Sequence, residues 1–275
     1  MNLPPSQIVP KLADEGTYIA SESSFYRVMK KHNQLAHRGK QRKASKKAAP
    51  TTYVARNPNE VWTWDITYLP AKVKGKYYYL YLVTDIFSRY GVAWDVCESE
   101  SGEDAAKLMA RAKLSQNCLH QPLVLHSDNG APMKSLTLKA KLEELKIIAS
   151  YSRPRVSNDN PYSEAMFKTL KYCPQWPSKG FENIESARLW VNEFMDWYNN
   201  KHYHSGIKFV SPAQRHEGTD HKILDNRTNV YEIAFNKRPE RWSGSRRNWS
   251  RQNEVTLNPE KIENVPESQK LIKEG

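Results

Sequence analysis

The strongest candidates for catalytic or metal-binding residues in this chain are three carboxylates, Asp65, Asp128 and Glu164. Few histidines lie near them in the sequence, and carboxylate oxygens suit hard ions such as Mg²⁺ or Mn²⁺. Two such ions about 3.5–4 Å apart can activate an attacking oxygen and stabilise a leaving oxygen in phosphoryl transfer. The three carboxylates could do this chemistry only if the fold brings them together.

Asp65 and Asp128 stand at unusual places in apolar segments. Asp65 lies within VWTWDITYL (61–69), where aspartate is a poor strand residue and a buried carboxylate needs a partner, a metal or a proton. A buried, hydrogen-bonded aspartate is the alternative. Asp128 ends an apolar run and precedes Asn129-Gly130, and all three residues tolerate tight backbone angles. A plain turn is therefore the alternative interpretation of Asp128.

Glu164 lies near the start of a predicted helix that Pro161 suits as a first residue. Glu164, Lys168 and Lys171 follow one another at i, i+4 and i+7, so one helix face would carry a carboxylate and two ammonium groups. The carboxylate could bind a metal and the two lysines could contact DNA phosphates. A surface Glu–Lys pair is the alternative. Asp159, in the loop before this helix, is a candidate helix cap.

A mixed α/β sheet covered by helices is the fold class that the apolar pattern predicts. Three successive strands form an antiparallel meander, and helices alternate with strands after it. If the first and fourth strands are neighbours, Asp65 and Asp128 converge at one end of the sheet. The predicted strands span 61–69, 76–86, 89–96, 122–127 and 146–151, and the helices after the meander span about 101–116, 133–145, 159–173 and 183–199.

The N-terminal residues predict two short helices, about 5–15 and 21–32, joined by a tight turn. A helix-turn-helix unit is consistent with this pattern, and an ordinary α-hairpin is an equal alternative. Arg27, Lys30 and Lys31 lie on the second helix, where a recognition helix would carry basic side chains.

Charge and composition favour a polyanionic partner. The chain carries a formal net charge of +12, and six Lys or Arg residues, Arg42 and Lys43 among them, fall within residues 38–47. A second basic group, RRNWSR, spans 246–251. With the carboxylates, these features favour a nuclease or nucleotidyl transferase over a plain binding protein.

The sequence also gives an expectation for the cellular compartment of the protein. No apolar run reaches the roughly 18 residues that span a bilayer. The N-terminus lacks the pattern of a signal peptide. The three widely spaced cysteines fit a reducing cytoplasm.

Three segments around the carboxylates resemble the motifs of the DDE transposase and retroviral-integrase superfamily. These are WDITYL, LHSDNGAPM and SRPRVSNDNPYSEAMFKTLKY, and 35 residues separate Asp128 from Glu164, as in that superfamily. YNNKHYHSGIKFVSP (198–212) is similar to a further family motif, with His202 where arginine is usual. From about residue 3 to about residue 260, the chain most resembles the second-frame (OrfB) transposases of bacterial insertion-sequence family three.

This resemblance implies a ribonuclease-H-like fold with a five-stranded mixed sheet, preceded by the helix-turn-helix segment. It implies that Asp65, Asp128 and Glu164 bind two Mg²⁺ ions, for which Mn²⁺ can substitute. DNA at the element's ends would be cut, and the freed 3′-OH would attack another phosphodiester. We expect DNA as partner, bound by Lys168, Lys171 and the basic N-terminal residues. We also expect a homo-oligomer on DNA, the first-frame protein as a further candidate partner, no membrane partner, and a cytoplasmic, nucleoid-associated location.

The expected organisation has four parts: a helix-turn-helix-like segment (1–36), a basic linker (37–57), the catalytic core (58–215) and a polar, basic, largely irregular C-terminal tail (216–275). Two other functions remain open from the residues alone. One is a DNA-binding regulator without chemistry, and the other is an unrelated metal-dependent nuclease of the same fold.

Overall fold

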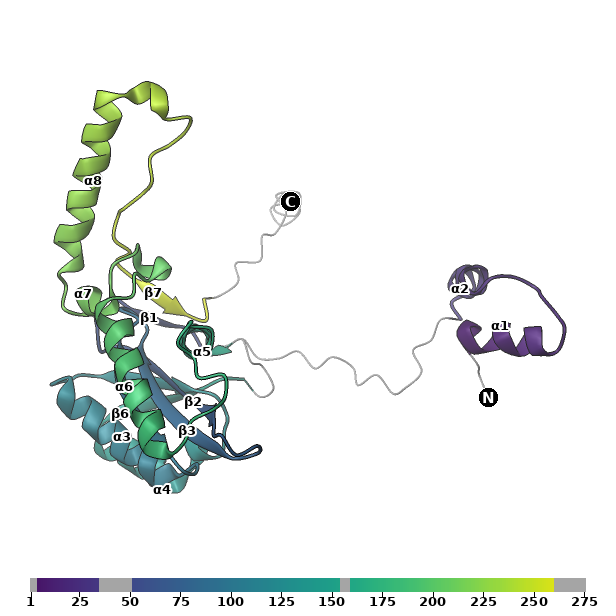
Figure 1. Ribbon diagram of the computed structural model, residues 1–275, viewed down its shortest axis with the longest axis horizontal. Helices are drawn as coiled ribbons and strands as arrows, with labels where there is room; N and C mark the ends of the chain where they lie inside the picture. Colours follow the sequence, from purple (N-terminus) through teal and green to yellow (C-terminus); the bar gives the residue numbers. More distant parts are fainter. Residues whose placement is uncertain (1–3, 35–50, 154–158, 260–275) are drawn as a thin grey trace, which may run out of the picture. The chain divides into compact units, whose positions relative to one another are not determined.

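The computed structural model describes residues 4–34, 51–153 and 159–259, and it separates into two units, Met1–Lys47 and Ala48–Gly275 (Figure 1). The first unit contains the two predicted helices, α1 (Pro5–Asp14) and α2 (Glu22–Lys31), which pack on each other. Gly16, with a positive φ of 76°, follows α1. The helices are as expected, and DNA binding by a helix-turn-helix stays a prediction.

The second unit is built on a mixed sheet of five strands within the described residues. Three antiparallel strands come first in the chain, and two parallel strands are added beside the first of them. The strand order is β4-β3-β2-β5-β6, which confirms the predicted ribonuclease-H-like α/β fold. The strands are β2 (Val61–Pro70), β3 (Tyr77–Asp85), β4 (Gly91–Cys97), β5 (Leu123–Ser127) and β6 (Ile147–Tyr151).

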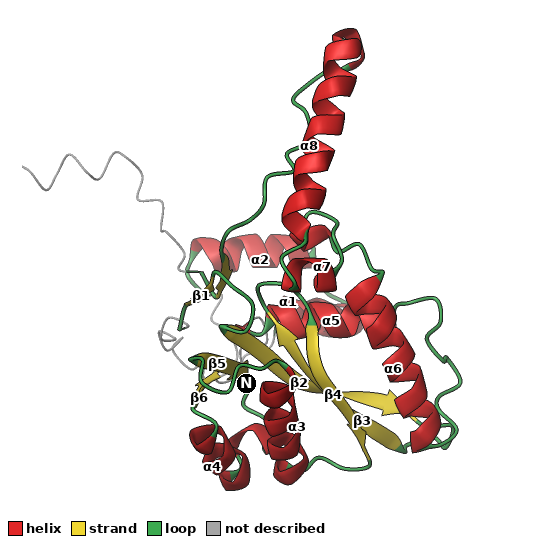
Figure 2. Ribbon diagram, turned by 90° about the vertical axis from the view of Figure 1, so that its left-hand side faces the viewer, coloured by secondary structure: helices red, strands yellow, loops and turns green. Residues whose placement is uncertain are grey.

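Helices cover both faces of this sheet (Figure 2). On one face, Trp62 and Trp64 of β2 pack in a core with apolar residues of α3 and α4. On the opposite face, Leu69 of β2 packs with residues of α5 and α6. Alternate residues of β2 thus enter two different cores, which is why this strand is apolar on both sides. The helices are α3 (Gly102–Ser115), α4 (Leu136–Glu144), α5 (Pro161–Lys171) and α6 (Ile184–Asn200).

The C-terminal region differs from the irregular tail that we expected. Residues 220–237 form an 18-residue helix, α8 (Asp220–Lys237), after a short helix, α7 (Pro212–His216). The chain then returns and forms β7 (Val255–Leu257), which pairs antiparallel with β1 (Tyr53–Ala55). The expectation was wrong for α8 because its side chains are mostly polar and only two of them are buried, so no apolar period marks it.

Among the described residues, short 3₁₀ segments connect these elements: η1 (Pro132–Lys134), η3 (Ser205–Ile207) and η4 (Pro239–Arg241). The strand β1 lies inside the segment that we expected to be linker. In the part of the chain that the structure describes, no helix combines the length and the apolar character needed to span a membrane.

Candidate active site

Asp65 lies in the central strand β2, on the sheet face that α5 and α6 cover. Its Oδ1 accepts a hydrogen bond of 2.7 Å from the backbone N–H of Ile66. The pKa of Asp65 is raised to about 7, chiefly by burial and also by the negative charges of Asp128 and Glu164, while Ile66 N–H and Lys171 oppose the shift. The structure therefore places the three carboxylates within electrostatic reach of one another.

Asp128 follows β5 directly, and strand register explains why it approaches Asp65. The strands β2 and β5 run parallel, and Thr63 pairs with His126. Asp65 and Asp128 each lie two residues beyond this pair, so they stand at the same level along the two strands, where β5 has ended and β2 continues beside β3. The turn interpretation also holds, because Asp128 Oδ1 accepts a 2.9 Å hydrogen bond from Gly130 N–H. The turn presents the carboxylate at the sheet edge.

Glu164 lies exposed in the first turn of α5, and the start of this helix is tied to β2. Asn160 immediately precedes α5, and its Nδ2 donates a 3.2 Å hydrogen bond to the carbonyl oxygen of Trp64, the residue before Asp65. This buried contact holds the first turn of α5 against the strand that carries Asp65. It is a direct physical reason why Glu164 lies close to Asp65.

The loop before α5 is held from the β5 side as well. His126 Nε2 donates a 2.9 Å hydrogen bond to the carbonyl oxygen of Asp159, and its Nδ1 lies 3.0 Å from Ser150 Oγ. Because a carbonyl can only accept, Nε2 carries a proton, and burial lowers the pKa of His126, which disfavours the charged form of the ring. The strand that precedes Asp128 is thereby linked to the loop that precedes Glu164.

An ion pair fixes the same loop. Arg153 donates to both carboxylate oxygens of Asp159, with N–O distances of 2.9 Å, and the Arg153 guanidinium holds the pKa of Asp159 below its usual range. The expectation that Asp159 caps the helix was wrong: Asn160 stands at the cap position, and the Asp159 carboxylate is taken up by Arg153. Sequence reasoning missed His126, Arg153 and Asn160 as positioning residues, because their partners are backbone carbonyls or a loop carboxylate.

The predicted DNA-binding lysines of α5 are exposed beside Glu164. Lys171 interacts with the Asp65 charge, and desolvation lowers the pKa of Lys171 while Asp65 opposes this shift. Lys168 lies on the same helix, one turn after Glu164. His202 is different: its ring centroid lies 4.9 Å from that of Trp197, and burial lowers its pKa, so this ring is part of an aromatic cluster.

The remaining predicted DNA-binding residues lie elsewhere in the chain. Arg27, Lys30 and Lys31 are exposed on α2 in the first unit, and Arg42 and Lys43 fall outside the described residues. Within residues 4–34, 51–153 and 159–259, no group of three or more His, Cys, Asp or Glu side chains is close enough to hold a single metal ion. In the same ranges, none of the three carboxylates forms an ion pair with a basic side chain.

Comparison with known proteins identifies relatives over most of the second unit. An integrase core domain model matches residues 55–157, and a second integrase core domain model matches residues 145–212. The transposase for insertion sequence element IS904 of Lactococcus lactis is 32% identical over 164 residues, which cover 58% of this chain and 62% of that protein. This chain thus matches less than two thirds of that relative's length.

A second transposase and one solved structure are also similar to this chain. The transposase InsF for insertion sequence IS3A of Escherichia coli is 26% identical over 223 residues, covering 74% of this chain and 75% of that protein. The solved HTLV-2 integrase catalytic core domain in complex with magnesium is 20% identical with a TM-score of 0.42, covering 58% of this chain and 97% of that chain.

Proposed function

The chain belongs to the DDE transposases with an integrase core domain, the family that includes the transposases of the IS3 elements, and from this premise we propose its reaction. It cuts DNA at the ends of an insertion sequence and joins the freed 3′-OH to another strand. Asp65, Asp128 and Glu164 are the catalytic carboxylates. The observation that carries this proposal is the mutual approach of the three carboxylates, which helps to hold the pKa of Asp65 near 7.

The donor set fits a hard divalent cation. Oxygen atoms alone are offered, and the carboxylates repel one another without an ion-pair partner among the described residues. When bound, two Mg²⁺ ions, or Mn²⁺ in their place, would activate the attacking oxygen and stabilise the leaving oxygen. Asp65, Asp128 and Glu164 are the residues that would hold these ions. Asp65 must lose its proton before it can act as a ligand.

The chain's other residues orient this site and its DNA. Asn160 and His126 hold the helix of Glu164 and the strand of Asp128 in place through hydrogen bonds to backbone carbonyls. Lys168 and Lys171 supply positive charge next to the carboxylates, where a terminal phosphodiester would lie. Arg27, Lys30 and Lys31 would contact DNA from the first unit, with Arg42 and Lys43 as further candidates.

The reaction makes further partners part of the proposal. Both ends of an element must be handled together, so we propose a homo-oligomer on DNA, with the first-frame protein of the same element as a further partner. Its place of action is the nucleoid. These proposals rest on the family and on the basic charge of the chain.

The proposed function is tested by looking for the joined product in cells. The gene, its native flanking DNA and any upstream frame are placed on a plasmid in a bacterial host, and outward amplification detects joined element ends. Wild type is compared with Glu164→Gln and with the control Glu193→Gln, which alters an exposed glutamate of α6. We expect a junction with wild type and the control and none with Glu164→Gln. A junction with Glu164→Gln would refute the site, and a soluble wild-type protein without any junction would favour a DNA-binding regulator.

A further inference from the structure

The helix α8 and the chain that returns from it form an arm, residues 220–251, that projects from the core of the second unit (Figures 1 and 2). Aromatic contacts hold its two halves together: the Tyr231 ring lies 5.8 Å from Trp242 and 5.5 Å from Trp249, and Phe235 lies 5.9 Å from Trp242. With 18 residues at about 1.5 Å each, α8 spans roughly 27 Å. The end of α8 at Lys237, which we call the tip of the arm, is therefore far from its start at Asp220, which we call the root.

The root of the arm is fixed to the core by a buried charge network. Asp220, at the start of α8, pairs with Arg215 at 3.0 Å and with Arg251 of the returning chain at 2.7 Å. Arg215 also donates a 3.0 Å hydrogen bond to the carbonyl oxygen of Phe87 in the core. Both halves of the arm thus meet at one buried carboxylate, which fixes the direction in which the arm leaves the core.

The tip of the arm is strongly basic. Residues 237–247 contain five Lys or Arg residues and a single acidic residue, Glu240. All five basic side chains are exposed. Among the described residues, the only ion pair that involves any of them is the one between Arg246 and Glu232, at 3.7 Å. Four exposed positive charges of this segment therefore lack a carboxylate partner among the described residues.

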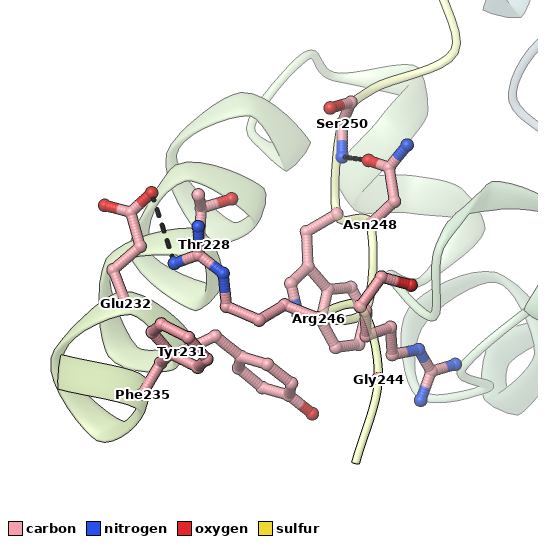
Figure 3. Close-up of a pocket in the computed structure, with 11 residues that line it drawn as sticks. Thr228, Tyr231, Glu232, Phe235, Gly244, Arg246, Asn248 and Ser250 are labelled. Carbon is pink, nitrogen blue, oxygen red and sulfur yellow. Dashed lines mark hydrogen bonds and ion pairs between the residues drawn. The ribbon is translucent and has the colours of Figure 1, made fainter. Parts of the chain in front are cut away.

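Two arginines of the returning chain are already ordered by aromatic rings. The Arg246 guanidinium lies 5.1 Å from the centre of the Phe235 ring, and Arg247, nearer the root of the arm, lies 4.5 Å from the rings of both Trp249 and Phe209. Figure 3 shows Arg246 reaching from the returning chain to Glu232 beside a pocket of about 470 Å³. A guanidinium that stacks on a ring keeps its N–H edge available, so less side-chain entropy is lost when it binds a phosphate.

We propose that the arm is a second DNA-binding element, whose tip grips the phosphate backbone of duplex DNA away from the carboxylate site. The inference rests on the proposed function for its choice of partner. At about 3.4 Å per base pair, the arm's roughly 27 Å corresponds to about eight base pairs. The residues that would contact phosphates are Lys237, Arg238 and Arg241 at the tip, with Arg246 and Arg247 of the returning chain as further contacts.

Duplex DNA fits this surface better than a second copy of the chain does. The tip offers exposed, unpaired cations, whereas this chain as a whole is basic, with a net charge of +12, and would repel such a tip. Val230 and Ile233 are exposed on α8, and they are the feature by which another copy would bind instead. The oligomeric state is therefore measured alongside DNA binding.

The test uses the full-length protein and a fluorescein-labelled 30-base-pair duplex of arbitrary sequence, with anisotropy measured over a series of salt concentrations. The triple variant Lys237→Gln/Arg238→Gln/Arg241→Gln is compared with a matched triple variant of exposed or half-exposed lysines, Lys107→Gln/Lys139→Gln/Lys141→Gln. The salt slope is the slope of the logarithm of the binding constant against the logarithm of the salt concentration. Each lost phosphate contact lowers its magnitude by about one, so the slope of the tip variant should be smaller than that of wild type by about three. The control should keep the wild-type slope, and Arg246→Gln should reduce the magnitude of the slope by about one.

The outcomes separate this inference from the proposed function. If the tip variant, still folded by its unfolding midpoint, binds with the wild-type slope, the arm proposal is overturned while the carboxylate site is unaffected. If the slope is unchanged but sedimentation shows that an oligomer has dissociated, the arm is an interface between copies and the proposal is equally overturned. Glu164→Gln should retain the full slope, whether or not it joins DNA.

Discussion

Replacing Asp65 with asparagine should stabilise the metal-free protein at alkaline pH. The pKa of Asp65 is raised from 3.8 to about 7, chiefly by burial, and each unit corresponds to about 1.4 kcal/mol. The ionised carboxylate therefore costs the fold up to about 4 kcal/mol above pH 7, and asparagine removes this cost while keeping the shape. Below pH 3.8 the carboxyl is protonated in both the folded and the unfolded chain, so the cost vanishes there.

The assay is urea unfolding with EDTA present, between pH 4.5 and pH 8.5. We expect the difference between Asp65→Asn and wild type to grow as the pH rises towards 7 and then to level off. Asp225→Asn, which changes an exposed aspartate of α8, serves as the matched control. A less stable Asp65→Asn protein, or a difference that does not change with pH, would refute this account of the Asp65 environment.

Mg²⁺ should narrow the stability difference between Asp65→Asn and wild type at pH 8. A cation that binds the folded state alone stabilises it by about 2.7 kcal/mol at a concentration 100 times its Kd. Wild type should gain this stability at pH 8, and Asp65→Asn should gain little, because one shared ligand is lost. If Mg²⁺ increased the free energy of unfolding of both proteins equally, the cation would bind at a site that does not include Asp65.

Two other substitutions test the anchoring of the arm and the turn at the site. Asp220→Ala should lower the free energy of unfolding by about 3–5 kcal/mol in urea, because it leaves two arginines without their shared buried carboxylate, whereas Asp225→Ala should change it by less than about 0.5 kcal/mol. Gly130→Ala should weaken Mn²⁺ binding measured by titration calorimetry, because the new Cβ would lie 2.8 Å from Met133 Sδ and 3.1 Å from Asp128 Oδ1. Mn²⁺ affinity equal to wild type would show that the Asp128 carboxylate is not displaced.

Apolar patterning was sufficient to predict the sheet and its two layers of helices. Strands such as β2 and β3 are rich in aromatic and β-branched residues, and α6 has a clear apolar period, so local composition marks them. The helix α8 carries no such mark, because it buries only Asp220 and Leu224 and is held by contacts with a chain segment that follows it. A helix held by ion pairs and aromatic contacts with residues far away in the sequence has no apolar pattern of its own by which it could be predicted.

The carboxylates of the site could be singled out from sequence, but the contacts that position them could not. Asp65 stands out because an aspartate interrupts an apolar strand, whereas Asn160 resembles any loop asparagine until its partner, the Trp64 carbonyl, is known. His126 is likewise identified only when strand β5 and the loop before α5 are adjacent. Hydrogen bonds to backbone carbonyls depend on tertiary structure, so they cannot be predicted from the type of residue that donates them.

The central claim, that Asp65, Asp128 and Glu164 together hold the metal ions for DNA joining, is tested most directly by changing the ligand chemistry. Mg²⁺ binds oxygen ligands, whereas Mn²⁺ accepts sulfur more readily. Asp65→Cys and Asp128→Cys proteins are assayed for end joining on a plasmid that carries the element with its native flanks. We predict that joining is lost with Mg²⁺ and partly restored with Mn²⁺. Joining by either variant at the wild-type rate with Mg²⁺ would contradict the claim.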